Sequence, residues 1–214
     1  MELIGIFAMV LSLSICLAIN PYLSLLILSI VAKNGFAMLM PPSLLFITED
    51  MFMVMLAMLA IINFFVDMTP GLDSAWDLFH TVIRVPLAAL FTFILLTRAE
   101  PAYSEGVQAF AFCIGLGVGL CVHFGKSSLR AYFNSKSHLA YNWFASTSET
   151  ILIIVLLALT LNFRMLSYGL SIPLIALALY LIKSYWRDFQ HLSVHMIMWI
   201  RKRKGWREED TFFD

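Results

Sequence analysis

Apolar runs of about 20 residues recur along this chain, and a helix of that length crosses roughly 30 Å of hydrocarbon. Hydrophobic residues make up 61% of the 214 positions and charged residues only 13%, against about 25% charged residues in soluble domains. We therefore expect an all-α, polytopic membrane helix bundle of about six spans. The predicted spans are residues 3–32, 50–66, 77–97, 107–124, 149–163 and 168–185.

The first of these runs is interrupted at Asn20-Pro21. Proline removes a helical hydrogen bond, so the sequence predicts a helix break at this point. The N-terminus has no basic segment and no small-residue cleavage site, so we interpret the run as a membrane helix and not as a cleaved signal peptide.

Residues 1–185 are predicted to form the transmembrane domain, with halves 1–97 and 107–185 of three spans each. Thr48-Glu49 opens the second span, and Ser148-Glu149 opens the fifth. If the halves share a fold, they are inserted in opposite directions, which is the plan of many secondary transporters. The alternative is that any two apolar three-helix stretches look alike, and the weak similarity between the halves leaves both interpretations open.

Residues 186–214 are predicted to form an amphipathic interfacial helix with a basic cluster, "RKRK", at 201–204. This tail would contact anionic lipid or a cytoplasmic protein partner. Lysine and arginine are also concentrated between residues 124 and 148. Because basic residues favour the cytoplasmic side, an even number of spans predicts that both termini are cytoplasmic.

A first polar stripe lies in the third predicted span. Asp73, Asp77, His80 and Arg84 are spaced at i, i+4, i+7 and i+11, which places them on one helix face. A charge inside the membrane is costly, so Arg84 needs a partner or a wet cavity, and Asp67 is one candidate partner. The alternative is that the aspartates only cap a helix while the arginine extends to the headgroups.

A second polar stripe follows the fourth predicted span. His123, Lys126, Arg130 and Asn134 are spaced at i, i+3, i+7 and i+11. Such a stripe can bind phosphate headgroups or pair with the acids of the first stripe. It can also serve simply to anchor the cytoplasmic side, so three interpretations stay open.

Other motifs are better explained by packing than by chemistry. Gly115-x-x-x-Gly119 lets two helix backbones approach closely. Cys16, Cys113 and Cys121 lie within apolar runs and are typical of small apolar core residues. No catalytic motif, metal ligand set, cofactor fingerprint or nucleic-acid-binding pattern is present, so we expect none of these functions.

Three stretches of the chain form a recognisable set: "INPYLSLLILSIVAKNG" (19–35), "FFVDMTPGLDSAWDLFHTVIRVP" (64–86) and "VHFGKSSLRAYFNS" (122–135) followed by "STSETI" (146–151). They resemble the signature stretches of one bacterial family of integral membrane proteins, which is called domain of unknown function 4126. The chain departs from the family pattern at Asn63, where an acid is usual, and at Met68, where a lysine is frequent. The resemblance implies one polytopic domain in the bacterial cytoplasmic membrane. It does not point to any particular reaction.

The leading functional hypothesis is a small inner-membrane carrier or lipid-translocating protein with a polar site between two helical halves, for an anionic small molecule or lipid headgroup. The competing hypothesis is a membrane-embedded scaffold or sensor that recruits a cytoplasmic partner through its basic tail. Membrane lipids are expected partners, and a homo-oligomer is compatible with both functional hypotheses. The candidate site residues are Asp67, Asp73, Asp77, His80, Arg84, His123, Lys126, Arg130 and Glu149.

Overall fold

The computed structural model describes residues 3–36, 42–99, 105–136 and 139–203, and these ranges contain seven α-helices and no strand. A π-helical turn (Ala32–Phe36) follows the second helix, and a 3-10 helix (Pro42–Thr48) precedes the third. The α-helices are α1 (Leu3–Ile19), α2 (Pro21–Val31), α3 (Asp50–Met68), α4 (Leu72–Ala99), α5 (Glu105–Ser135), α6 (Leu139–Asn162) and α7 (Arg164–Arg203).

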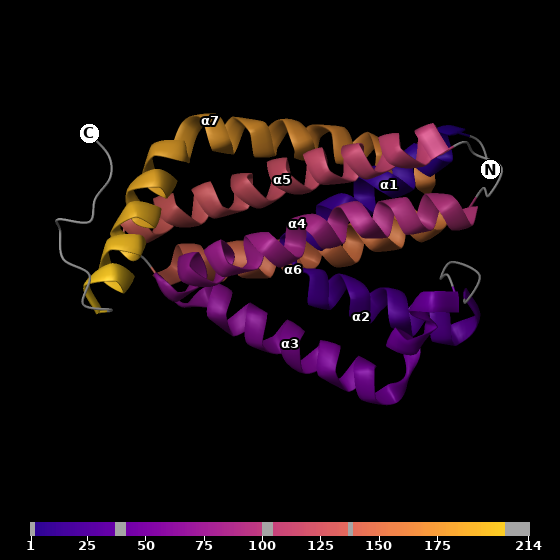
Figure 1. Ribbon diagram of the computed structural model, residues 1–214, viewed down its shortest axis with the longest axis horizontal. Coiled ribbons are helices and arrows are strands. Elements are labelled where there is room, and N and C mark those ends of the chain that lie inside the picture. Colours follow the sequence, from indigo (N-terminus) through magenta and orange to yellow (C-terminus); the bar gives the residue numbers. More distant parts are fainter. Residues whose placement is uncertain (1–2, 37–41, 100–104, 137–138, 204–214) are drawn as a thin grey trace.

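Five of the described helices are long and apolar enough to cross a membrane. They are α3, α4 up to Ile94, α5, α6 and α7 up to Val194. These helices extend along the length of the molecule, and α7 changes direction near its C-terminal end (Figure 1). The prediction of a multi-pass, all-helical membrane bundle is confirmed.

The first apolar run forms a helical hairpin instead of one interrupted span. Gly5, near the start of α1, lies against the side chain of Arg164 at the start of α7. Lys33, just after α2, forms an ion pair with Asp50 at the start of α3. Both outer ends of the hairpin therefore lie at one end of the bundle, and its apex lies inside the bundle (Figure 1).

The predicted break at Asn20-Pro21 is confirmed and explains this reversal. Asn20 has extended backbone angles (φ −147°, ψ 97°), so the helical hydrogen-bond ladder cannot continue through it. Its N–H still donates to the Cys16 carbonyl at 3.0 Å. Its side-chain oxygen accepts from the backbone N–H of Leu23 at 3.1 Å and caps α2, with Pro21 in the first turn.

The hairpin bears on two predictions about topology. Residues 1–97 contain two long spanning helices, α3 and α4, and α5 begins at the same end of the bundle as α1 (Figure 1). An inverted repeat requires the two halves to begin at opposite ends, so this arrangement does not support it. The described part of α7 ends at the end of the bundle opposite to the start of α1 (Figure 1), so the prediction that both termini are cytoplasmic is not confirmed.

Two predicted boundaries fall inside longer helices. Ser148-Glu149 does not open a helix, because α6 begins at Leu139. The predicted start of the tail, residue 186, lies within α7, where Trp186 and Phe189 make edge contacts with Phe124 of α5. Residues 204–214 of the predicted tail lie outside the described residues.

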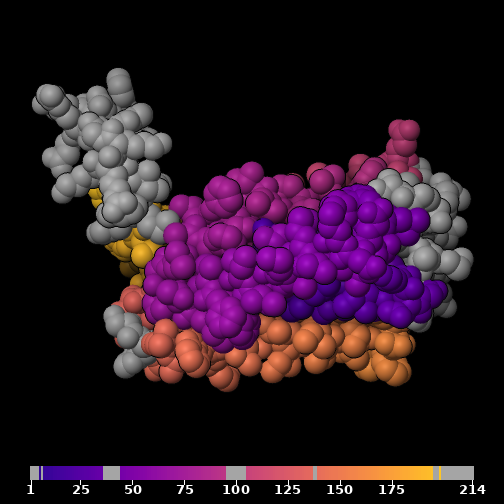
Figure 2. All heavy atoms as spheres, turned by 90° about the horizontal axis from the view of Figure 1, so that it is seen from below, coloured from indigo at the N-terminus to yellow at the C-terminus, as the bar shows by residue number. Residues whose placement is uncertain are grey.

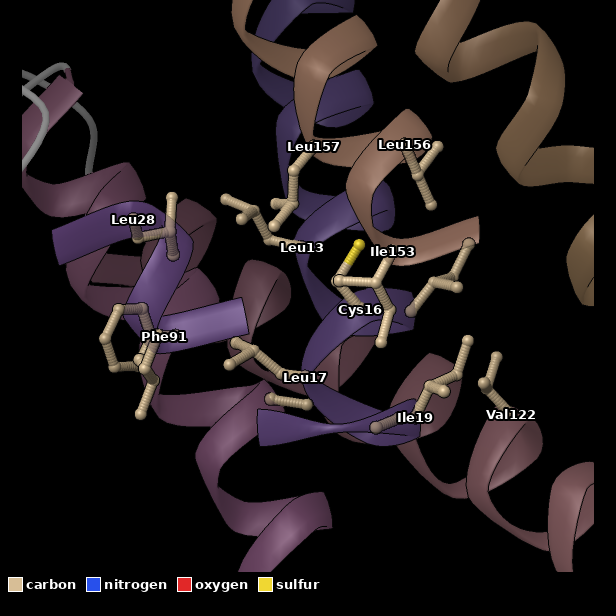
Figure 3. Packing of buried hydrophobic residues seen from close by; sticks show 14 of the residues in the cluster. Leu13, Cys16, Leu17, Ile19, Leu28, Phe91, Val122, Ile153, Leu156 and Leu157 are labelled. Carbon is tan, nitrogen blue, oxygen red and sulfur yellow. The ribbon is translucent and has the colours of Figure 1, made fainter. Parts of the chain in front are cut away.

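The hydrophobic core is organised around α1. Leu13, Cys16 and Leu17 of α1 are buried beside Ile153 and Leu157 of α6 (Figure 3). Cys16 therefore packs as a small apolar side chain. Helix α1 is enclosed by the other helices, which explains how a short helix is kept inside the bundle.

Helix α3 lies at the outside of the bundle. Met51, Val54, Met58 and Phe65 are exposed on it, and α2 is visible between α3 and α6 in Figure 2. Apolar exposure of this kind suits contact with lipid. The buried side chains of α3 towards its C-terminal end are polar, so polar contacts must attach this helix to the rest of the bundle.

Glycines allow α5 to approach its neighbours closely. Gly115 and Gly119 face Ala89 and Ala88 of α4, which confirms the predicted packing role of this pair. Gly125 faces α7, where an added Cβ would lie 2.9 Å from the Cα and the carbonyl oxygen of Ala178. The backbone of α7 cannot yield as a flexible side chain would.

We predict that Gly125→Ala lowers the free energy of unfolding by about 1–3 kcal/mol, because the added methyl group overpacks the α5–α7 contact. Gly117→Ala is the matched control on the same helix, since an added Cβ there meets nothing within 4 Å. It should be neutral or stabilising, because alanine favours a helix over glycine by about 1 kcal/mol. Reversible unfolding in mixed micelles measures both variants, and equal losses would contradict this packing.

Candidate functional site

The two polar stripes meet in the interior of the bundle. Asp77 and Arg84 of α4 and Arg130 of α5 have side chains that are at most 1% exposed, and Lys126 of α5 is 4% exposed. Helices α4 and α5 run in opposite directions (Figure 1), and their glycine contact brings the stripes close together. We call Asp67, Asp77, Arg84, Lys126, Arg130 and Glu149 the charged cluster.

Lys126 lies at the centre of the charged cluster. Its Nζ is 2.7 Å from Asp67 Oδ2 and 3.3 Å from Glu149 Oε2. Asp77 Oδ1 lies 3.8 Å away. The same ammonium group donates to the carbonyl of Ile19, at 3.3 Å, next to the helix break. One lysine therefore connects α3, α4 and α6 to the apex of the hairpin.

Arg130 connects α5 to α3 and α6. Its Nη2 lies 2.9 Å from Glu149 Oε1 and 3.0 Å from the Ser146 hydroxyl. Its Nη1 donates to the carbonyls of Asp67 at 2.6 Å and Asn142 at 3.1 Å. Because the first carbonyl belongs to the last turn of α3, this guanidinium also caps the end of that helix.

Arg84 is fully buried and pairs with Asp77 on its own helix. Its Nη2 donates to Asn63 Oδ1 at 2.8 Å. Asn63 also accepts from the indole N–H of Trp76 at 2.9 Å and donates to Asp67 at 3.1 Å. The suggested pairing of Arg84 with Asp67 is not observed, because Lys126 and Asn63 take that carboxylate.

The charges of the cluster balance. Three cations (Arg84, Lys126, Arg130) face three carboxylates (Asp67, Asp77, Glu149). Glu149 lies about 15 Å along α6 from the start of that helix, at 1.5 Å per residue. Buried ions in a membrane protein are tolerated when they are paired, so the cluster is an internally neutral unit.

The remaining predicted residues lie beside the cluster. Asp73 accepts from Asn134 at 2.8 Å and from its neighbour Ser74, outside the ion pairs. His80 faces the hairpin, where its Nε2 is 2.8 Å from the Tyr22 hydroxyl. His123 faces Thr81, with 2.7 Å between Nε2 and the hydroxyl oxygen. Among the described residues, no group of three or more His, Cys, Asp or Glu side chains is placed to hold a metal ion.

Sequence reasoning missed several neutral polar partners. On α6, Asn142 and Ser146 stand at i and i+4 before the predicted site residue Glu149 at i+7, and all three face Arg130. Asn63 similarly precedes Asp67 by one helical turn. These spacings are visible in the sequence, but the fifth span was predicted to begin at residue 149, which divided the α6 stripe, whereas α6 begins at Leu139.

The comparisons with known proteins identify a family. The family model "Domain of unknown function (DUF4126)" matches residues 7–184, which is most of the chain. The chain belongs to this family. The match spans α1 to α7, so the hairpin and the charged cluster both lie inside the family's domain. No curated protein and no solved structure was found to match the chain.

We predict that Arg84→Met lowers the free energy of unfolding by about 3–5 kcal/mol, because it leaves Asp77 buried without its guanidinium partner. Adding Asp77→Leu should restore part of the loss by removing the unpaired carboxylate. The control is Lys33→Met, whose ion pair with Asp50 is exposed (45% and 87%) and contributes at most about 1 kcal/mol. Unfolding of the purified protein in mixed micelles gives all three values, and similar losses for Arg84→Met and Lys33→Met would refute a stabilising cluster.

Proposed function

We propose that this protein is a small carrier or lipid-translocating protein of the bacterial cytoplasmic membrane, and that its charged cluster binds an anionic small molecule or lipid headgroup. One observation carries the proposal. Glu149 bridges Lys126 and Arg130, and its side chain is 19% exposed, whereas those of Asp67 and Asp77 are 4% and 1% exposed. Glu149 is therefore the accessible counter-ion of two buried cations.

A ligand anion can take the place of the Glu149 carboxylate. That carboxylate presents one oxygen to Lys126 at 3.3 Å and the other to Arg130 at 2.9 Å. A ligand carboxylate or phosphate also has two oxygens bonded to one carbon or phosphorus atom. Arginine and lysine bind such groups through charge-assisted hydrogen bonds. The displaced Glu149 carboxylate has to turn out of the cluster or take up a proton, and the exchange of one anion for another then keeps the cluster neutral inside the membrane, which lowers its electrostatic cost.

The broken helix supports a carrier more than a static scaffold. Transporters often place discontinuous helices at the ligand site, near the middle of the membrane. Here the break at Asn20 lies next to the cluster, because Lys126 donates to the carbonyl of Ile19. A change in the partners of Lys126 therefore acts directly on the apex of the hairpin. The polar site also lies between residues of the first half (Asp67, Asp77) and of the second.

The distribution of basic residues suggests an orientation. The end of the bundle that carries Lys136 and the C-terminal part of α7 contains more Lys and Arg than the end that carries Lys33 and Arg164. The positive-inside rule then places the Lys136 end in the cytoplasm. With five spanning helices and one hairpin, Leu3 would lie on the opposite side.

Reporter fusions test this orientation. We expect reporters inserted near residues 70 and 137 and after residue 203 to report the cytoplasm, and reporters before Leu3 and near residue 102 to report the opposite side. The physical reason is that the hairpin returns to the side from which it enters. A cytoplasmic signal from the N-terminal fusion, with the others as expected, would contradict the hairpin.

Substitution of Glu149 tests the site. We predict that Glu149→Gln increases the affinity for inorganic phosphate and acetate at least tenfold, because Lys126 and Arg130 lose their exchangeable counter-ion while the shape is kept. Arg130→Gln should weaken the same binding. The measurement is the concentration dependence of thermal stabilisation of purified protein, since a ligand that binds the native state raises its stability.

Glu49→Gln is the control for the loss of a carboxylate, because Glu49 is exposed at the N-terminus of α3. It should leave anion binding unchanged. If no anion stabilises the wild-type protein or the Glu149→Gln variant, the cluster serves only helix assembly. That result would favour the scaffold or sensor that recruits a partner through its tail.

A further inference from the structure

A cavity of about 140 Å³ adjoins the charged cluster between α1, α5, α6 and α7. Among the described residues that line it, Lys126 and Glu149 are polar and the others are aliphatic. Ile15, Leu152 and Leu174 contribute to these apolar walls. The cavity therefore joins an apolar compartment to the accessible edge of the charged cluster. We call it the lateral groove.

The position of the lateral groove favours entry from the membrane. Leu177, which lines it, is 50% exposed on the outer surface of the spanning part of α7. When α7 spans a membrane, the surroundings of that surface are lipid chains and not water. A hydrocarbon chain can therefore reach the groove sideways without passing through an aqueous phase.

We infer that the ligand is an anionic lipid, whose headgroup takes the place of the Glu149 carboxylate while one hydrocarbon chain occupies the lateral groove. This inference rests on the proposed function and narrows its ligand to one class. A free inorganic anion has no chain to place between the aliphatic walls, whereas a chain attached to the anion fills the groove. For a water-soluble ligand, that chain also removes apolar surface from water. Lys126 and Glu149 at the polar end of the groove supply the charge complementarity that places the headgroup there.

The chemistry of the headgroup follows from the two cations. It must carry one anionic group with two terminal oxygens, as Glu149 does between Lys126 and Arg130. A carboxylate, a phosphodiester and a phosphate monoester all offer two such oxygens. A neutral headgroup carries no anionic group, so neutral lipids are excluded as ligands of the cluster.

The test uses water-soluble ligands of increasing chain length. Inorganic phosphate, ethyl, butyl and hexyl phosphate are titrated onto the purified full-length protein in micelles, beside acetate, butyrate and hexanoate. We expect the dissociation constant of the wild type to fall by roughly fourfold for each methylene group that enters the groove. A longer alkyl chain should lower the dissociation constant in at least one of the two series, the phosphates or the carboxylates.

Two matched variants of α7 locate the chain. Leu177→Trp fills the groove, whereas Leu179→Trp makes the same change at a residue that is 57% exposed and does not line the groove. Both positions are exposed, so both variants should fold. We expect Leu177→Trp to abolish the increase in affinity with alkyl chain length and to keep the affinity for the bare anion. Leu179→Trp should resemble the wild type in both respects.

The outcomes separate this inference from the proposed function. If bare anions bind but chain length has no effect on the wild type, the ligand is a soluble anion, and only the lipid inference fails. The inference also fails if Leu177→Trp and Leu179→Trp change the chain effect equally, because the chain then lies outside the groove. If neither bare nor alkylated anions bind to any variant, the proposed function fails as well.

Discussion

Lys126 forms the contacts on which the arrangement of the bundle depends. Its ammonium group is buried, and it binds Asp67 of α3, Glu149 of α6 and the carbonyl of Ile19 at the end of α1. A buried ammonium group without partners is too costly to keep inside a membrane, so its position requires that all three elements converge on it. Arg130 and Arg84 extend the same constraint, because each bonds to residues of a neighbouring helix.

Helices whose surfaces are as apolar as lipid gain little from hydrophobic association with one another. The ion pairs and the close glycine contacts therefore determine which helices are neighbours.

The break at Asn20 and the charged cluster depend on each other. The break ends α1 within the bundle and leaves helical backbone groups that need partners. Asn20 itself satisfies one N–H of α2, and Lys126 binds the carbonyl of Ile19. In the opposite direction, the hairpin supplies Tyr22 to His80 and encloses the cluster from one side. A continuous first helix would have crossed the membrane and could not place these groups at the middle of the bundle. The same geometry lets the proposed exchange of anions at Lys126 act on the hairpin.

The polar contacts were only partly predictable from sequence. The spacing of Asp77 and Arg84, and of Lys126 and Arg130, predicted two one-sided stripes, because residues on one helix face follow from the helical period alone. The pairing of Asp67 with Lys126 was not predictable, since it depends on the packing of α3 against α5. Asn63, Asn142 and Ser146 were missed as partners for the same reason. Neutral polar residues in a membrane helix have several roles, and only the neighbouring helix decides which role applies.

The sequence by itself determined the membrane class, the helical composition and the site of the helix break. These properties depend on local quantities: the length of apolar runs, the helical period and the missing N–H of Pro21. The direction of the chain after Asn20 was decided by tertiary structure. A proline break is compatible with a kinked span as well as with a hairpin, and the contacts of Gly5 with Arg164 and of Lys33 with Asp50 select the hairpin. Because the hairpin returns to the end of the bundle from which it starts, α1 begins at the end opposite to the end of α7 (Figure 1). This arrangement does not support inverted symmetry between the two halves. Such long-range contacts have no signature in local spacing, because the two partners lie far apart along the chain.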